Sequence, residues 1–124
     1  MEKISVNYLS ENKGHYTPGI ISNGMLYISG QLSIDPDTRK VPEGGIDEHA
    51  RLALNNVERV LKSAGLTKNN VVQCRVYVTD IEKWDEVNKI YAEFFGEHKP
   101  VRIVVPVVKL HFGCLVEIEA IAEV

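Results

Sequence analysis

The most constraining feature of this sequence is the alternation of side chains between Cys114 and Ala122. In an extended strand, successive side chains point to opposite faces. One face of this segment would carry only small or apolar residues, which are Cys114, Val116, Ile118, Ala120 and Ala122. The other face would carry Glu117 and Glu119, with Leu115 and Ile121 on either side of them. The segment therefore predicts a strand with one face against a core and two carboxylates on the other.

A second strand is predicted between Val101 and Val108, where Arg102 is the single polar side chain. A strand that is apolar on both faces needs cover on both, and a second copy of so short a chain could supply it. Residues 109–113 are few enough to join the two strands as an antiparallel hairpin. Arg102 could then lie near Glu117 at cross-strand distance. This pair is either a structural ion pair at a subunit contact or a site that binds a carboxylate and moves protons.

Periodicity predicts the remaining elements. Alternation suggests a first strand from Ile4 to Tyr8, and Asn23-Gly24 is a two-residue hairpin signal between two strands. A first helix is predicted over residues 46–64 and a strand over residues 71–79. A second helix is predicted to begin after Asp80, its N-cap, and to end at Gly96. His49 lies just off the apolar stripe of the first helix, so we expect it in solvent. The order β-β-β-α-β-α-β-β predicts one α+β domain over residues 1–124, with a mixed sheet and two helices on one face. We expect neighbouring copies to cover the other face.

Composition narrows the function classes. The net charge of -3 and the scattered basic residues argue against a nucleic-acid binder that uses a basic face. No apolar run reaches the length of a membrane span, and the N-terminus is unlike a signal peptide, so we expect a cytoplasmic protein. Cys74 and Cys114 have no partners at metal-ligand spacing. Both are predicted to be buried apolar residues, and no metal or cofactor is expected.

Several short segments, each weak alone, together resemble a known family. They are Gly14-His15-Tyr16, Ser29-Gly30-Gln31, the helix of Asn88 that ends Tyr91-Ala92-Glu93-Phe94-Phe95, Arg102, and residues 115–122. In this order and spacing, and over nearly the whole chain, they resemble the RidA family of reactive-intermediate deaminases, also called YjgF/UK114 or L-PSP. The resemblance implies a chorismate-mutase-like homotrimer with clefts between subunits. It also implies a hydrolase that acts on C–N bonds other than peptide bonds and needs no cofactor or metal. Such an enzyme would convert 2-imino or 2-enamino acids, such as 2-aminoacrylate, 2-iminopropanoate and 2-iminobutanoate, to 2-keto acids and ammonia.

The resemblance also implies residue roles. Arg102 would bind the substrate carboxylate in a bidentate pair, and Glu117 would orient the attacking water and help the amine to leave. The implied substrate-binding positions are Tyr16, Gly30, Gln31, Asn88 and Val104. Among these, Tyr16 would pack over the ligand and Val104 would offer its backbone carbonyl. An imine carbon is already electrophilic, so positioning and one proton shuttle can supply most of the rate gain.

Two other functions remain open. In active relatives, this arginine is usually followed by a small polar residue and then often by Cys or Thr. Here Ile103 and Val104 occupy these two positions, so we expect a more apolar pocket than usual. A protein that binds a small metabolite without turning it over is the first alternative. An RNA-cleaving or translation-inhibiting protein, an activity attached to some family members, is the second, although the acidic composition speaks against it.

Overall fold

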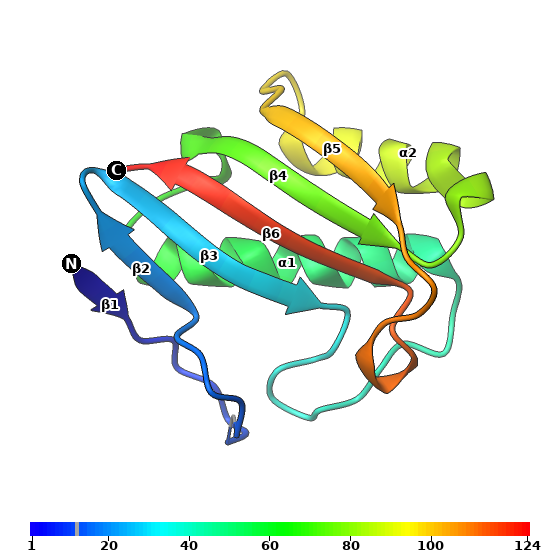
Figure 1. Ribbon diagram of the computed structural model, residues 1–124, viewed down its shortest axis with the longest axis horizontal. Coiled ribbons are helices and arrows are strands. Elements are labelled where there is room, and N and C mark those ends of the chain that lie inside the picture. Colours follow the sequence, from blue (N-terminus) through cyan, green and yellow to red (C-terminus); the bar gives the residue numbers. More distant parts are fainter. Residues whose placement is uncertain (12) are drawn as a thin grey trace.

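In the computed structural model, which describes residues 1–11 and 13–124, six strands form one sheet in the order β1-β2-β3-β6-β4-β5 (Figure 1). The strands are β1 (Glu2–Ile4), β2 (Gly19–Ser22), β3 (Met25–Leu32), β4 (Val71–Val78), β5 (Val101–Pro106) and β6 (Val116–Glu123). Neighbouring strands are antiparallel except for β4 and β5, which are parallel. Two helices lie on one face of this mixed sheet. The predicted α+β fold and the predicted order of elements are confirmed.

Local signals placed the first hairpin correctly. Asn23 and Gly24 join β2 to β3 and have φ values of 51° and 74°. Two successive residues in the left-handed region match the twist of the flanking strands, and Asn-Gly is the pair that tolerates this best. The first strand is shorter than predicted: β1 ends at Ile4, and the Tyr8 amide donates to the Val6 carbonyl in a turn.

The predicted hairpin between residues 101–108 and 114–122 is wrong. β4 lies between these two strands, so that Cys74 pairs with Arg102 on one side of β4 and Tyr77 pairs with Glu117 on the other. The reason is the helix between β4 and β5, which forms a crossover that returns the chain parallel to β4. Residues 107–115 then carry the chain past the end of β4 into β6.

The core lies between the sheet and the helices α1 (Ile46–Ser63) and α2 (Trp84–Phe95). α1 packs against β3 and β6, and α2 packs against α1. Both helices are amphipathic, and Gly96 ends α2 with a φ of 66°. The N-terminal part of the predicted second helix differs. Asp80 caps a separate 3-10 helix, Ile81–Lys83, and Ile81 and Trp84 are partly exposed instead of lying in the core.

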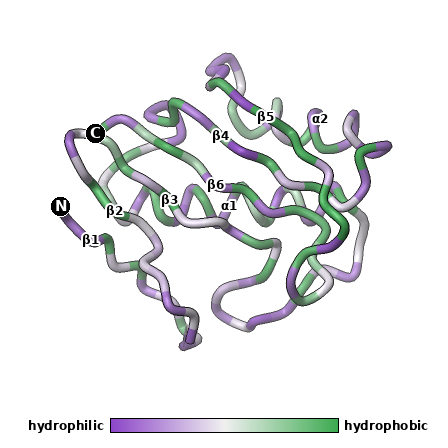
Figure 2. The backbone as a smooth tube through the Cα atoms, viewed as in Figure 1, coloured by the Kyte–Doolittle hydropathy of each residue, from purple (hydrophilic) through white to green (hydrophobic). Residues whose placement is uncertain are grey.

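The sheet face opposite the helices is open to solvent in a single chain and carries several large apolar side chains. Tyr27, Val101 and Ile103 are each about half exposed or more on this face. β5, an edge strand, is hydrophobic along most of its length (Figure 2). Among the described residues, no helix is long and apolar enough to cross a membrane.

Candidate functional site

The predicted site residues fall into two groups on opposite faces of the sheet. The β4–β5 register places Arg102 and Val104 beside Cys74 and Val76, whose buried side chains face the helices. The alternation of β6 turns Glu117 away from the helices. The expectation that Arg102 shares a face with Glu117 is therefore wrong, because it rested on the hairpin that β4 interrupts.

Arg102 is held in place by side chains of α2. Its Nη1 donates to Asn88 Oδ1 at 2.9 Å. Its guanidinium carbon lies 4.7 Å from the ring centroid of Tyr91 and 5.4 Å from that of Trp84, within the range of cation–π attraction. Among the residues that the structure describes, no carboxylate pairs with Arg102. The result is a half-buried, oriented guanidinium with donors left for a planar anion.

The layer beneath Arg102 is apolar. Burial raises the pKa of the Cys74 thiol to about 11, so that this thiol is neutral and packs as a small hydrophobic residue. Cys114 is buried as well, which confirms the prediction for both cysteines. No group of three or more His, Cys, Asp or Glu in the described part of the chain is arranged to hold a metal ion.

Glu117 lies against the backbone of Gly30 on β3. A Cβ atom at position 30 would be only 2.7 Å from Oε2 of Glu117. Glycine is therefore required here for the close approach of the carboxylate to the neighbouring strand. Burial, followed by the charge of Glu119, raises the pKa of Glu117, while His111 acts in the opposite direction. A carboxyl group with a raised pKa can exchange protons closer to neutral pH than an ordinary glutamate can.

A pocket of about 290 Å³ opens beside Gly30. Its walls include Tyr16, Gly30 and Gln31, so three of the predicted substrate-binding residues meet in one cavity. Tyr16 is about half exposed at this pocket, and the side chain of Gln31 donates to the Ser29 carbonyl at 3.0 Å. Sequence reasoning missed the contribution of residues 111–113, which form a turn before β6 and place two rings, His111 and Phe112, at the pocket.

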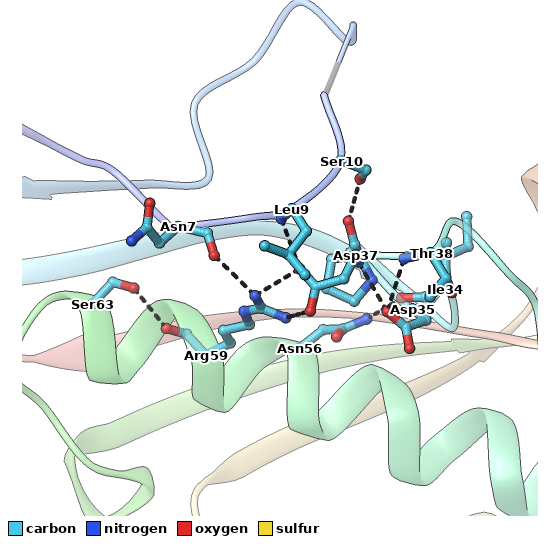
Figure 3. Close-up of polar contacts among 11 residues, drawn as sticks. Asn7, Leu9, Ser10, Ile34, Asp35, Asp37, Thr38, Asn56, Arg59 and Ser63 are labelled. Carbon is cyan, nitrogen blue, oxygen red and sulfur yellow. Dashed lines mark hydrogen bonds and ion pairs between the residues drawn. The ribbon is translucent and has the colours of Figure 1, made fainter.

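The wall of the pocket is fixed by an ion pair between α1 and the loop after β3 (Figure 3). Nη1 and Nη2 of Arg59 donate to the Asp37 carboxylate at 3.0 and 2.9 Å, and Nη2 also donates to the Asn7 carbonyl at 2.9 Å. The pair holds the pKa of Asp37 below its usual range, the hydrogen bond from Arg59 being the main cause. On the same helix, Asn56 donates to the carbonyls of Leu32 and Ile34. These contacts join the N-terminal segment, the loop and α1 into one support.

His49 is buried, not solvated as expected, and only 2% of it is exposed. Its Nδ1 accepts from the Leu115 amide at 3.2 Å and lies 2.6 Å from the Ser33 hydroxyl, while Nε2 lies 3.1 Å from the Pro42 carbonyl. This pattern requires the neutral ring, with its proton on Nε2. His49 therefore ties together the end of β3 and the approach to β6, next to the Leu32–Glu117 pair.

Stability should fall in acid because of His49. Burial lowers the pKa of this ring, so the unfolded chain binds its proton at a higher pH than the folded chain does. The free energy of unfolding should therefore decrease as the pH falls below the ordinary histidine pKa of about 6.5. The hydrogen bond to the Pro42 carbonyl, followed by the charges of Glu48 and Asp47, opposes this lowering of the pKa without reversing it. His49→Ala should lower stability by roughly 2 kcal/mol at pH 7.5, because Ser33 and Leu115 lose their acceptor.

Urea unfolding of the wild type, His49→Ala and the exposed control His15→Ala, each at pH 7.5 and 5.5, measures both effects. If His49→Ala loses as much stability between the two pH values as the wild type does, the acid sensitivity does not come from His49.

Comparison with known proteins identifies the family. The family described as Endoribonuclease L-PSP matches residues 9–124. The human 2-iminobutanoate/2-iminopropanoate deaminase is 38% identical over 109 residues, which cover 88% of this chain and 80% of the human protein. The chain belongs to the RidA/L-PSP family.

Solved structures of the RidA/L-PSP family agree with this assignment. The structure of YyfA from Yersinia pestis, described as a protein of unknown function of the conserved Rid protein family, is 41% identical, with a TM-score of 0.92 over 99% of this chain and 98% of that one. The structure of E. coli TdcF with bound serine is 31% identical, with a TM-score of 0.92 over 100% of this chain and 99% of that one. The RidA-type fold that the resemblance implied is confirmed.

Proposed function

We propose that this protein is a homotrimeric deaminase that hydrolyses 2-imino acids in clefts between subunits, with Arg102 of one subunit facing Glu117 of the next. The observation that carries the proposal is the guanidinium of Arg102. It is oriented by Asn88, Trp84 and Tyr91, yet lacks a carboxylate partner in the described chain. Such a group is ready for the carboxylate of a small substrate. The deaminase name of the human relative supports the choice of reaction.

A second copy is needed because one chain separates the two groups. Arg102 is on the helix side of an edge strand, and Glu117 is on the open side of a central strand. The open face and the β5 edge expose Tyr27, Val101 and Ile103, which would be covered by neighbouring copies. A closed ring of three repeats one contact between unlike surfaces, so each cleft can receive Arg102 from one copy and Glu117 from another.

The chemistry follows from these two groups. Arg102 would hold the substrate carboxylate, which fixes the imine carbon next to Glu117. The Glu117 carboxylate would accept a hydrogen bond from a water molecule and take its proton as the oxygen bonds to the imine carbon. The same proton would then go to the nitrogen, which gives a carbinolamine. Glu117 would next take the hydroxyl proton of the carbinolamine and pass it to the amino nitrogen as the C–N bond breaks, so that a 2-oxo acid and ammonia leave. One water molecule is consumed and Glu117 returns to its starting state.

The remaining predicted residues would shape the cleft. Tyr16 would pack over the bound imine, and Gly30 and Gln31 would line its side. Asn88 would act as a positioning residue through its hydrogen bond with Arg102. Val104, two residues after Arg102 on the same face of β5, would offer its backbone carbonyl.

The test is an imine-hydrolysis assay. An amino-acid oxidase generates 2-iminopropanoate or 2-iminobutanoate, and the release of the 2-oxo acid is measured with and without the purified protein. Acceleration well above the rate in buffer supports the proposal. Tight binding of 2-oxobutanoate by calorimetry with no acceleration would instead identify a protein that binds the metabolite without turning it over. No acceleration and no binding would rule out both.

Gly30→Ala should impair the reaction through Glu117. The new Cβ would clash with Oε2 and push the carboxylate away, so kcat should fall by about 10- to 100-fold, as expected for a displaced general base. The backbone at position 30 does not require a positive φ, so the variant should still fold. Stopped-time assays of Gly30→Ala, Glu117→Gln and the double variant test the mechanism. If Gly30→Ala reduces kcat by the same factor in the wild-type protein and in the Glu117→Gln protein, it does not act through Glu117.

A further inference from the structure

The pocket at Gly30, the residue that the Glu117 carboxylate approaches, is lined by cations that the proposed reaction does not use. Lys13 and Arg39 both line the cavity that Tyr16, Gly30 and Gln31 line. Among the described lining residues, these two carry the only permanent charges, although the chain as a whole has a net charge of -3. The pocket therefore attracts anions independently of Arg102, which is not among its lining residues.

Arg39 is held at the pocket. Its backbone has a φ of 66°, its amide donates to the Asp35 carbonyl at 2.8 Å, and its guanidinium carbon lies 5.8 Å from the ring centroid of Phe112, a second lining residue. The nearby acid Asp37 is committed to Arg59 through two hydrogen bonds. Within the described chain, no ion pair neutralises Arg39 or Lys13.

The cavity is also larger than a three-carbon imino acid needs. Its volume of about 290 Å³ is close to the lower end of the range for pockets that hold drug-sized ligands, roughly 300–1,000 Å³. Aromatic and aliphatic side chains supply much of its wall, among them Tyr8, Ile34 and Phe112. A longer substrate side chain could run along these residues and end at the cations.

We infer that the preferred substrates are dicarboxylic 2-imino acids, whose second carboxylate at the end of the side chain is bound by Arg39 and Lys13. The inference rests on the proposed function, since it assigns the first carboxylate to Arg102 and the imine carbon to the neighbourhood of Glu117. It adds the substrate class, which the deaminase reaction itself leaves open.

The test compares two imines that share a carbon chain. 2-Iminoglutarate has a terminal carboxylate, and 2-iminopentanoate lacks it. We expect kcat/KM of the wild type to be about tenfold or more higher for 2-iminoglutarate, the size of one charge-assisted contact at a partly exposed site. The variant with both Lys13→Gln and Arg39→Gln should lose most of this ratio. Lys40→Gln, which removes a neighbouring exposed charge outside the pocket, should keep it.

Equal kcat/KM values for the two imines in the wild type, or an unchanged ratio in the double variant, would overturn the inference. If the wild type hydrolyses neither of these imines but does hydrolyse 2-iminopropanoate, the inference fails and the proposed function stands. If it hydrolyses none of the three, the proposed function fails, and calorimetry with the two products decides the inference separately. Tighter binding of 2-oxoglutarate than of 2-oxopentanoate, lost in the double variant, would support the anion site. Equal binding of the two products would refute it.

Discussion

Arg102→Ala is expected to lower kcat/KM for imine hydrolysis by at least about a thousandfold, which corresponds to roughly 4 kcal/mol. The guanidinium is oriented by Asn88 Oδ1 at 2.9 Å and by the rings of Tyr91 and Trp84 before any substrate arrives. Its removal would abolish the bidentate contact that fixes the imine carbon, and no other described cation shares its face of β5. Rates with an oxidase-generated imine measure the loss.

Two further variants make this result specific. Arg102→Lys keeps the charge but loses the planar fork and much of the stacking, so its activity should lie between those of wild type and Arg102→Ala. Arg51→Ala removes an exposed α1 arginine whose ion pair with Glu93 spans 3.9 Å, and it should behave as wild type. Arg102→Ala protein that melts like the wild type and hydrolyses imines at the wild-type rate would eliminate the proposed carboxylate site.

Glu117→Gln is expected to reduce kcat by about 10²- to 10⁴-fold, the usual contribution of a general base. The amide keeps the size of the side chain and fits beside Gly30, but it cannot take a proton from water. Because burial raises the pKa of Glu117, the acid limb of the wild-type pH–rate profile should lie at higher pH than for an ordinary glutamate. The acid limb should be absent from the residual activity of the variant.

The same substitution should not cost stability at neutral pH. A carboxyl group whose pKa is raised on folding makes the folded state less stable as the pH rises through that pKa, because the folded chain must release a proton that it holds more tightly. At pH 7 the Glu117→Gln protein should therefore melt at the wild-type temperature or above it. Glu123→Gln, an exposed change at the end of β6, is the matched control. A Glu117→Gln protein with full activity and an unchanged acid limb would remove Glu117 from the mechanism.

Much of the fold could be read from local patterns. The alternation along 114–122 predicted which side of β6 is buried, and Asn23-Gly24 predicted the β2–β3 turn, because both depend on neighbouring residues. The pairing of β5 could not be read in this way. Two strands close in sequence often pair, but here the α2 crossover places β5 beside β4 and leaves β6 on the other side. Strand order depends on contacts between residues that are distant in the sequence. The pattern of side chains within one strand does not predict these contacts.

The site was predictable to the extent that it follows from family resemblance. Tyr16, Gly30 and Gln31 do meet in one pocket, but the face on which Arg102 lies follows from the β4–β5 register and was misjudged. His49 could have been recognised, since it lies three residues after Ile46 and four before Ala53, both buried on α1. Arg39 gave no comparable signal, because loop positions carry no periodicity.

The central claim is that each site takes Arg102 from one copy and Glu117 from another, and mixed oligomers test it most directly. Arg102→Ala and Glu117→Gln chains with different tags are co-expressed, and oligomers that carry both tags are purified. In a trimer that carries both tags, one of the three clefts receives both native groups, so about one third of the sites should be complete and active. The shared site predicts that the mixed oligomers recover about this fraction of the wild-type activity, although each variant alone is nearly inactive. Mixed oligomers that remain as inactive as the separate variants would contradict it.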